Sequence, residues 1–452
     1  MKYIDWPVNF ERPDIWQKPM KDKLPKVGKT YLKYAEEIIA FDKLKVDAEK
    51  EICDTVKKNM NLSNTKNELS QRLGEVFEFY SKAVIADEDL DVEFLLKKTN
   101  VNTLNKKLQG WCKNLVCNIP LVIGSKPYME FEEKFKNIPA FVCLAGPSLR
   151  NNREKLLSVK GKALIIAVDT SLRPLLDIGV VPDFVVTHDA NPNGCKFFLS
   201  KDHPYNVNNT QLNDMNDMQL GMEYAKMMLD KDRLNFKYDT IGFFVNYCHP
   251  LTLLAFNGSE KRFYGVWDPS LPVYDCMSGS CDYKIEDGKY IPQKKGRVVG
   301  GSSVGHVAAY IAVNLGCNPV SFLGMDLSYP GGKTYVEGAS NQKDTAKQKL
   351  IELDDLSGNK VPTNLSMLSY KMVFERSLPQ VIMSRGTKFY NCTEDDKGNP
   401  AGILEVGAEP KTLQWVIDNK CKDVDVQKII NDIKSEIPKD IIAKDIVDSV
   451  KG

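Results

Sequence analysis

The sequence lacks an excess of charge of either sign. Its 61 lysines and arginines balance 60 aspartates and glutamates, so the chain has no overall electrostatic attraction for a polyanion. Nucleic acid is therefore excluded as the expected partner. Histidine is scarce as well: the chain has 4, and none follows His306, which leaves its last part without an imidazole base.

Long apolar runs and regular cysteine spacing are also absent. No run approaches the ~20 apolar residues of a membrane-spanning helix, and the first residues lack the apolar segment of a signal peptide. The 11 cysteines are irregularly spaced and do not indicate a disulfide framework. Cys112 with Cys117 and Cys276 with Cys281 have no matching His or Cys pairs around them, so no metal site is predicted. We expect a cytoplasmic protein without a membrane span.

Three regions of the chain differ in composition. Residues 1–118 are rich in lysine and glutamate and have helical periodicity over 31–58 and 67–84. Residues 119–405 alternate short apolar runs with helical segments, and residues 406–452 repeat isoleucine at helical spacing. We predict a helical N-terminal region, a core domain and a C-terminal helical segment with these boundaries.

The middle region contains apolar runs that are typical of buried strands. They cover residues 140–145, 163–168, 184–187, 240–245, 320–323 and 388–391. Continuous apolar strands that alternate with helices form parallel sheets covered on both faces. The predicted fold is therefore α/β, with a Rossmann-like, mostly parallel sheet. Ligands bind beyond the carboxyl ends of such strands, so polar residues directly after each run are candidate site residues.

The loop Gly300–His306 (GGSSVGH) is the most informative of these segments. It leads directly into a helix, and a helix N-terminus offers backbone N–H groups and the positive end of a dipole. With hydroxyls nearby, this arrangement is suited to a phosphate or carboxylate. Gly301, Ser302 and Ser303 are therefore candidate binding residues. His306 lies one turn from Ser303 and off the apolar stripe, which favours a functional role over core packing.

Further polar residues follow the other predicted strands. They are Gly146, Pro147 and Ser148 after the first strand, Asp169 after the second, Asp189 after the third, Asp326 after the fifth, and Asn391, Thr393 and Glu394 after the last. Asp169 has a second interpretation, as the N-cap of a helix over 170–178. Asp183 precedes its strand and is expected to be a turn residue. Each group is weak evidence alone, but all of them except Asp183 are expected at the carboxyl ends of the strands.

Four segments carry a resemblance to a known family. They are AGPSL at 145–149, IIAVDTSLRPLLDIGVVPDFVVTHD at 165–189, GGSSVGHVAAYIAVNLGCNPVSFLGMDLSYPGGKTY at 300–335, and NCTE at 391–394. They resemble the motility-associated factor (Maf) flagellin glycosyltransferases, whose MptE-like central domain is similar to a 6-hydroxymethylpterin pyrophosphokinase. The core also resembles the donor-binding half of bacterial CMP-sialic acid sialyltransferases.

This resemblance implies a cytoplasmic glycosyltransferase without a required cofactor. It would move a nonulosonic acid, of the pseudaminic, legionaminic or Kdo-like type, from a CMP-sugar to Ser or Thr hydroxyls of flagellin. The residues that would bind the nucleotide-sugar are Gly146, Pro147, Ser148, Asp169, Gly301, Ser302, Ser303, Asn391 and Thr393. Asp326 would stabilise an oxocarbenium-like centre. His306, Asp189 and Glu394 are the candidate bases for the acceptor hydroxyl.

The chain departs from the sialyltransferase pattern, and two alternatives stay open. The related enzymes place a catalytic histidine downstream, but no histidine follows His306 here, so that base is not carried over. One alternative is an ATP-dependent pyrophosphoryl transferase acting on a pterin-like alcohol, with Asp169, Asp183 and Asp189 holding Mg²⁺. The other is a flagellin-binding protein that keeps the fold without catalysis.

Overall fold

The structure is a computed structural model. It describes residues 131–208, 210–229, 238–245, 247–257, 303–339 and 350–435, the short strands at 263–266, 283–286 and 289–292, and the single residues Gly110, Trp111, Asn114, Asn118 and Phe236. The helices predicted over 31–58 and 67–84, the cysteine pairs, Gly301 and Ser302 lie outside these residues.

The chain divides into two compact units. One comprises residues 1–117 and 269–294, and the other comprises 118–268 and 295–452. In the first, an antiparallel pair is formed by β6 (Tyr283–Glu286) and β7 (Lys289–Pro292). The predicted three-part division of the sequence stays a prediction.

The second unit is built on an eight-stranded sheet with the order β12-β11-β8-β1-β2-β3-β4-β5. The strands are β1 (Ala140–Cys143), β2 (Leu164–Val168), β3 (Phe184–Thr187), β4 (Ile241–Val245), β5 (Phe263–Val266), β8 (Val320–Leu323), β11 (Phe389–Asn391) and β12 (Glu409–Pro410). Every neighbouring pair is parallel. The predicted α/β fold is confirmed, and all six predicted strands are present.

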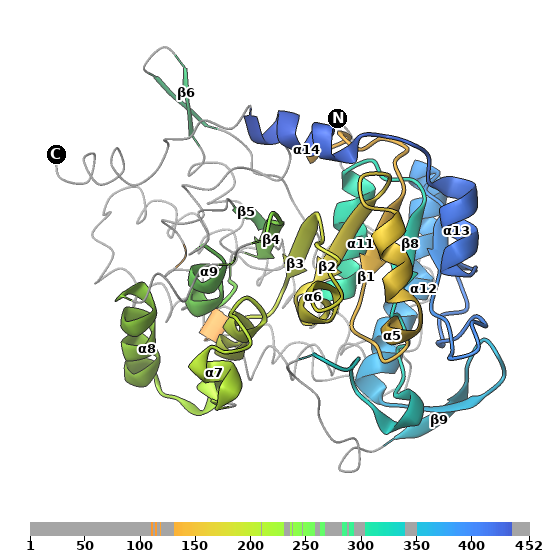
Figure 1. Cartoon of the computed structure of the whole chain (residues 1–452), viewed down its shortest axis with the longest axis horizontal. Coiled ribbons are helices and arrows are strands. Elements are labelled where there is room, and N and C mark those ends of the chain that lie inside the picture. Colours follow the sequence, from red (N-terminus) through yellow and green to blue (C-terminus); the bar gives the residue numbers. More distant parts are fainter. Residues whose placement is uncertain are drawn as a thin grey trace, which may run out of the picture. The chain divides into compact units, whose positions relative to one another are not determined.

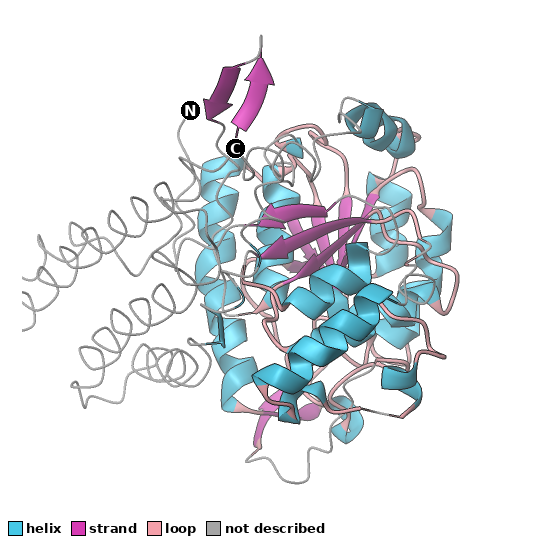
Figure 2. Cartoon of the chain, turned by 90° about the vertical axis from the view of Figure 1, so that its left-hand side faces the viewer, coloured by secondary structure: helices cyan, strands magenta, loops and turns pink. Residues whose placement is uncertain are grey.

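Helices cover both faces of this sheet (Figures 1 and 2). On one face, Phe141 and Cys143 of β1 belong to a buried cluster with Leu149 of α5 (Leu149–Asn152), Leu175 of α6 (Asp169–Leu176) and Leu413 of α13 (Leu413–Lys420). Buried apolar side chains on alternate strand positions are what a sheet packed on both sides requires.

The opposite face packs against α11 (Val304–Asn314) and α12 (Leu365–Arg385). Phe374 of α12 contacts Phe322 of β8, with ring centroids 5.6 Å apart. The helix predicted directly after Ser303 is therefore present as α11. The helix predicted over 170–178 is present as α6 and begins at Asp169.

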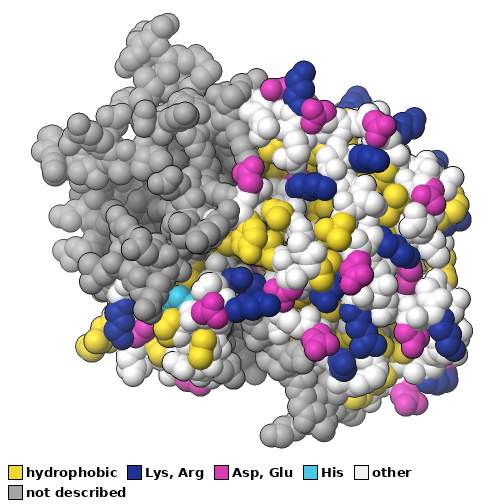
Figure 3. Space-filling view, viewed as in Figure 1, with side chains coloured by type: hydrophobic (Ala, Val, Ile, Leu, Met, Phe, Trp, Pro, Cys, Tyr) yellow, Lys and Arg dark blue, Asp and Glu magenta, His cyan; other side chains and the backbone are white. Residues whose placement is uncertain are grey.

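Shorter elements complete the second unit. They are α7 (Pro204–Val207), α8 (Asp217–Leu229), α9 (Pro250–Asn257), α14 (Val426–Ser435), the antiparallel pair β9 (Ile351–Asp354) and β10 (Lys360–Thr363), and 3-10 turns at Arg153–Ser158, Pro192–Phe197, Leu212–Asp214 and Pro330–Gly332. In the view of Figure 3, acidic and basic side chains are interspersed on the described surface. No helix within the described ranges is both long and apolar enough to span a bilayer.

The strand order reverses beside β1. The chain runs from β1 through β2, β3 and β4 to β5 on one side, and then places β8, β11 and β12 on the other side of β1. In parallel sheets, ligands bind outside the carboxyl ends of the two strands at such a reversal, here β1 and β8. This is where the loops that follow β1 and β8 meet.

Candidate functional site at the carboxyl edge of the sheet

The loops after β1 and β8 are in close contact at the switch point. The Gly146 N–H donates to the Gly324 carbonyl oxygen at 3.0 Å. A Cβ at Gly146 would lie 2.0 Å from Oδ2 of Asp326 and 2.4 Å from the Gly324 oxygen. No side chain fits there, so glycine is required by the close approach of the two loops. Gly146 itself is half-buried, whereas Pro147 is buried.

Asp326 holds the loop after β1 in place. Its Oδ2 accepts hydrogen bonds from the Ser148 hydroxyl at 2.7 Å and from the Ser148 backbone N–H at 3.2 Å. Burial raises the pKa of this carboxyl to about 6, against the opposing effect of the two bonds from Ser148. The structure therefore brings Ser148 and Asp326 together as predicted, but both are buried and bonded to each other.

The N-terminus of α11 lies beside the end of β1. Gly305 is buried against Leu144: a Cβ at Gly305 would come within 2.4 Å of Leu144 Cδ2. Ser303 is the N-cap residue of α11 and is half-buried. Its hydroxyl does not bond a helix N–H, and lies instead 2.8 Å from Nδ1 of His306. The first turn of α11 thus lies at the carboxyl end of β1, as an anion site at this helix N-terminus requires.

The position of His306 contradicts the prediction that its side chain lies outside the core. Its side chain is 1% exposed and stacks on Phe374, with ring centroids 3.6 Å apart and ring planes at 19°. Burial lowers the pKa of this imidazole to about 3, so the ring is neutral at physiological pH. The sequence spacing placed His306 off the apolar stripe of α11. That prediction failed because α12, which supplies Phe374, covers a second side of α11.

Asp169 and Asp189 follow β2 and β3 at the same edge. Asp169 is buried, and its Oδ1 accepts from the Thr170 N–H at 2.7 Å, while Thr187 donates its hydroxyl to Oδ2. Burial raises the pKa of Asp169 to about 6, and the negative charge of Asp189 adds to this effect. The N-cap interpretation of Asp169 is wrong, because Val168 is the N-cap residue and Asp169 is the first residue of α6. Its role in binding stays a prediction.

Asp189 is the more accessible of these two carboxylates. It is half-buried, and its oxygens accept hydrogen bonds from the backbone N–H and the side-chain amide of Asn191. The neighbouring His188 pairs with the Tyr247 hydroxyl through Nε2 at 2.7 Å. Asp189 is thus a carboxylate held in a fixed direction by local bonds.

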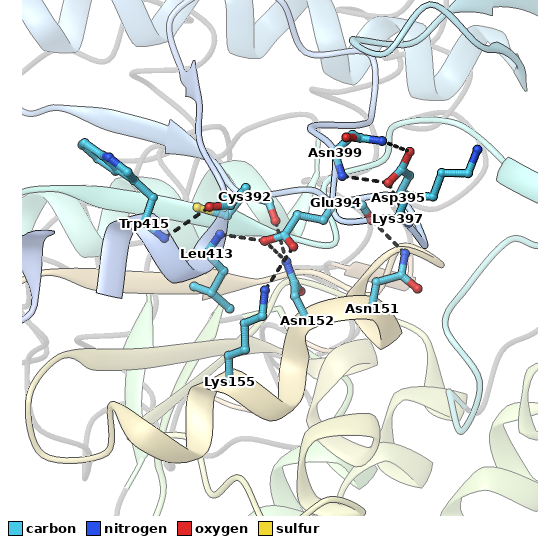
Figure 4. A network of polar contacts seen from close by, with 11 residues as sticks. Asn151, Asn152, Lys155, Cys392, Glu394, Asp395, Lys397, Asn399, Leu413 and Trp415 are labelled. Atoms are coloured by element: carbon cyan, nitrogen blue, oxygen red, sulfur yellow. Dashed lines mark hydrogen bonds and ion pairs between the residues drawn. The ribbon is translucent and has the colours of Figure 1, made fainter. Parts of the chain in front are cut away.

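Glu394 belongs to a buried structural network (Figure 4). One carboxylate oxygen accepts from the Leu413 N–H at 2.6 Å and from the Asn152 amide at 3.1 Å, and the other pairs with Lys155 at 3.2 Å. Glu394 is only 2% exposed. Its oxygens tie the segment after β1 to the start of α13, which leaves them engaged rather than available to an acceptor hydroxyl.

Asn391 and Thr393 support the loop after β8. The Thr393 hydroxyl accepts from the Met325 N–H at 3.2 Å, and Oδ1 of Asn391 accepts from the Thr393 N–H at 3.1 Å. Both side chains are fully buried. They hold the backbone next to Asp326.

Asp183 does not join the other aspartates. It lies at the amino end of β3, where Oδ2 accepts from the Ile165 N–H at 2.8 Å and Oδ1 pairs with Lys160 and Gln427. The Mg²⁺ set of Asp169, Asp183 and Asp189 is therefore not assembled, because a whole strand separates Asp183 from Asp189. Among the described residues, no group of three or more His, Cys, Asp or Glu side chains is placed to hold a metal ion.

Two tyrosines near these carboxylates were not predicted as site residues. Burial raises the pKa of Tyr335 to about 12, and Asp169 and Asp189 add to this rise. Burial also raises the pKa of Tyr370, again with a contribution from Asp189. These phenols therefore stay protonated and can only donate or accept hydrogen bonds. Tyr335 lies inside the motif at 300–335, but Tyr370 of α12 has no sequence signal that ties it to this edge.

Comparison with known proteins places part of this unit in a family. Residues 113–213, which include β1, β2 and β3, match the family described as 6-hydroxymethylpterin diphosphokinase MptE-like. The structure of a MAf glycosyltransferase from Magnetospirillum magneticum AMB-1 is similar at 14% sequence identity with a TM-score of 0.43, and the match covers 80% of this chain and 50% of that one. The chain thus spans about half the length of that protein. No curated protein matches it. Residues 113–213 are thus similar to the MptE-like family, which the sequence motifs also indicated.

Proposed function

We propose that the protein is a glycosyltransferase that moves a nonulosonic acid from a CMP-sugar to Ser or Thr hydroxyls of flagellin in the cytoplasm. The observation that carries this proposal is the arrangement at the carboxyl ends of β1 and β8, where the loops after both strands meet and Gly305 in the first turn of α11 packs against Leu144. A CMP-sugar of this type bears a phosphate and a carboxylate, and both suit a helix N-terminus lined by a hydroxyl. The resemblance of residues 300–335 to the Maf proteins supplies the sugar-nucleotide class.

The structure suggests a division of roles among the candidate binding residues. Ser303 and the first-turn N–H groups of α11 bind the phosphate or the carboxylate, together with the preceding Gly301 and Ser302. Gly146, which has no side chain, lets the loop after β8 lie against the end of β1, because Asp326 and the Gly324 oxygen fill the position of its missing Cβ. The remaining predicted residues are buried, and we assign them to the support of these loops: Pro147, Ser148, Asp169, Asn391 and Thr393.

The reaction needs charge stabilisation and one base. The bond between the anomeric carbon and the phosphate oxygen breaks, CMP leaves with the electron pair, and an oxocarbenium-like centre remains. The acceptor oxygen then bonds to that carbon and loses its proton to the base. We assign the base to Asp189, because it is half-buried at the correct edge, whereas His306 and Glu394 are enclosed. Asp326 acts behind the site, by fixing Ser148.

A thermal-shift series tests the nucleotide class. The purified protein is heated with CMP, CTP, UDP, GDP or ATP, each with and without Mg²⁺. A ligand at about 100 times its Kd stabilises the native state by about 2.7 kcal/mol, which raises the melting temperature measurably. The proposal expects a shift with cytidine nucleotides that does not need Mg²⁺, followed by a mass increase of flagellin after incubation with a CMP-nonulosonic acid. Flagellin that binds the protein but gains no mass would favour the non-catalytic alternative.

Variants at two positions test the assigned roles. Ser303→Ala should raise the KM for the CMP-sugar by about 10-fold, since a hydrogen bond to a charged group contributes about 1.5–3 kcal/mol. Asp189→Asn should lower kcat by about 100-fold or more, as expected for loss of a general base. Ser357→Ala, the same substitution as the first but at an exposed site beyond β9, is the control. Parent-like kinetics in both site variants would refute the assignment.

The second candidate is pyrophosphoryl transfer from ATP to a pterin-like alcohol. The match of residues 113–213 to the MptE-like family favours it. The position of Asp183 at the opposite end of β3 weighs against the three-aspartate Mg²⁺ site that we expected for it. A thermal shift that appears only with ATP and Mg²⁺ together would support this reaction over transfer from a CMP-sugar.

A further inference from the structure

The hydroxyl of Ser303 is used in an unusual way for an N-cap residue. An N-cap serine ordinarily accepts a hydrogen bond from a backbone N–H of the first helical turn. Ser303 has the extended backbone of an N-cap, but its side chain makes no such bond. Its Oγ lies 2.8 Å from Nδ1 of His306 instead. The first turn of α11 is therefore not closed by its own cap.

His306 is rigidly held where it meets this hydroxyl. The ring is 1% exposed, stacks face to face on Phe374 at 3.6 Å between centroids, and lies edge-on to Tyr370 at 6.5 Å. Phe374 is itself fully buried and contacts Phe322 of the central strand β8. The position of Nδ1 is thus fixed by the packing of α11 and α12 against the sheet.

A neutral imidazole in this environment is suited to orientation rather than proton transfer. The ring is enclosed, so an acceptor hydroxyl cannot approach it without displacing Phe374 or Ser303. When the neutral ring carries its proton on Nδ1, it donates to the Ser303 oxygen and leaves the serine hydroxyl proton for an anion at the half-buried helix start. A hydroxyl that is already oriented loses less conformational entropy on binding a ligand than one that rotates freely.

We propose that His306 is a positioning residue, which fixes the Ser303 hydroxyl at the first turn of α11 for the anionic group that binds there. It acts through Ser303 and touches no reacting atom. This inference rests on the proposed function for the identity of the anion, the phosphate or carboxylate of the CMP-sugar. It replaces the prediction that His306 is a candidate base.

Paired substitutions separate this role from simple packing. Asn at 306 keeps a polar atom near the position of Nδ1, whereas Gln places its polar atoms nearer the position of Nε2. Calorimetric titration of the full chain with CMP should give a Kd about 10-fold weaker for Ser303→Ala and for His306→Gln, and within about 3-fold of the parent for His306→Asn. The double variant Ser303→Ala/His306→Gln should be no weaker than Ser303→Ala alone, because the two residues act as a unit.

Further measurements keep the outcomes distinct. Urea unfolding of both His306 variants shows whether they are equally folded, so that a difference in binding reports on the polar atom. Unchanged CMP binding in His306→Gln, or losses that add in the double variant, would overturn the inference. If CMP fails to bind the parent protein, the proposed function is wrong, and the same titrations with inorganic phosphate decide the role of His306. If phosphate also fails to bind the parent, the inference falls with it.

Discussion

At the scale of single residues, two buried carboxylates at the carboxyl edge have different consequences for stability. The Asp326 carboxyl accepts two hydrogen bonds from Ser148 and is near the positive charge of Arg150, but burial outweighs these effects and raises its pKa from 3.8 to about 6. Glu394 is equally buried but faces Lys155 and two N–H donors. The first carboxyl destabilises the fold when it ionises, and the second holds two segments together.

Asp326→Asn should change how stability depends on pH. Between pH 4 and 6 the native state binds a proton at Asp326 that the unfolded state has lost, so the free energy of unfolding falls as the pH rises through this window. Above pH 6, ionisation of the buried Asp326 carboxyl lowers the free energy of unfolding by on the order of 3 kcal/mol. The variant lacks this titration, so its stability relative to the parent should increase from pH 4 to pH 7.

Urea unfolding at four pH values between 4 and 7 measures this difference. Ser328→Ala is the matched control, because its hydroxyl bonds the Asp326 backbone carbonyl and not the carboxylate. That variant should keep the pH dependence of the parent. Parallel curves for Asp326→Asn and the parent would contradict the explanation from burial.

Glu394→Ala should destabilise the protein by about 2–4 kcal/mol, since it leaves the buried Leu413 N–H without its acceptor and removes one of the two acceptors of the Asn152 amide. Glu394→Gln keeps an oxygen for Leu413 and should cost about 1 kcal/mol, because Lys155 is partly exposed and its ion pair is screened. Urea midpoints and transfer assays on both variants check this. A folded Glu394→Gln variant without turnover would restore Glu394 as a candidate base.

At the scale of elements, the sequence predicted the strands more fully than the helices. β3 and β8 match their predicted ranges because short, continuous apolar runs are distinctive in a covered parallel sheet. The long helix α12 was not predicted, since two of its six buried positions are the serines Ser369 and Ser377. β5 and the two-residue β12 were also missed. β12 lies at the sheet edge with exposed side chains and carries no apolar pattern.

The close approach of the loops after β1 and β8 predicts a large effect of one methyl group. Gly146→Ala would place a Cβ 2.4 Å from the Gly324 backbone oxygen, so the loops must separate. We expect the free energy of unfolding to fall by about 1–3 kcal/mol and nucleotide binding to weaken. Gly221→Ala is the control: nothing lies within 4 Å of a Cβ there, in the middle of α8. That change should stabilise by up to ~1 kcal/mol. Equal urea midpoints for the two variants would refute the steric argument.

At the scale of the whole molecule, the sequence predicted which edge of the sheet the candidate residues share but could not rank them. The candidates of the described core follow strands that end at this edge, because parallel strands end together. Burial then separates them: Asp189 and Ser303 remain partly exposed, whereas His306 and Glu394 are enclosed. That distinction depends on α12 and on the segment after β1, whose packing against the site is a long-range contact. Spacing along the chain carries no information on such contacts.

The cooperativity of the sheet predicts how its cysteines react. Cys143 of β1, Cys317 before β8 and Cys392 after β11 are buried, and burial raises the pKa of each thiol. Only the thiolate reacts with alkylating reagents, so these three should be labelled only when the sheet opens. Because they lie on neighbouring strands of one sheet, one global opening should expose all of them with the same free energy. Cys421 is half-buried and serves as the internal control, which should be labelled first.

Pulsed alkylation in increasing urea, read at each site by mass spectrometry, measures the four opening free energies. Labelling of Cys392 well before Cys143 would show that the β11 side of the sheet opens on its own, and β8 would then lose its neighbouring strand without global unfolding.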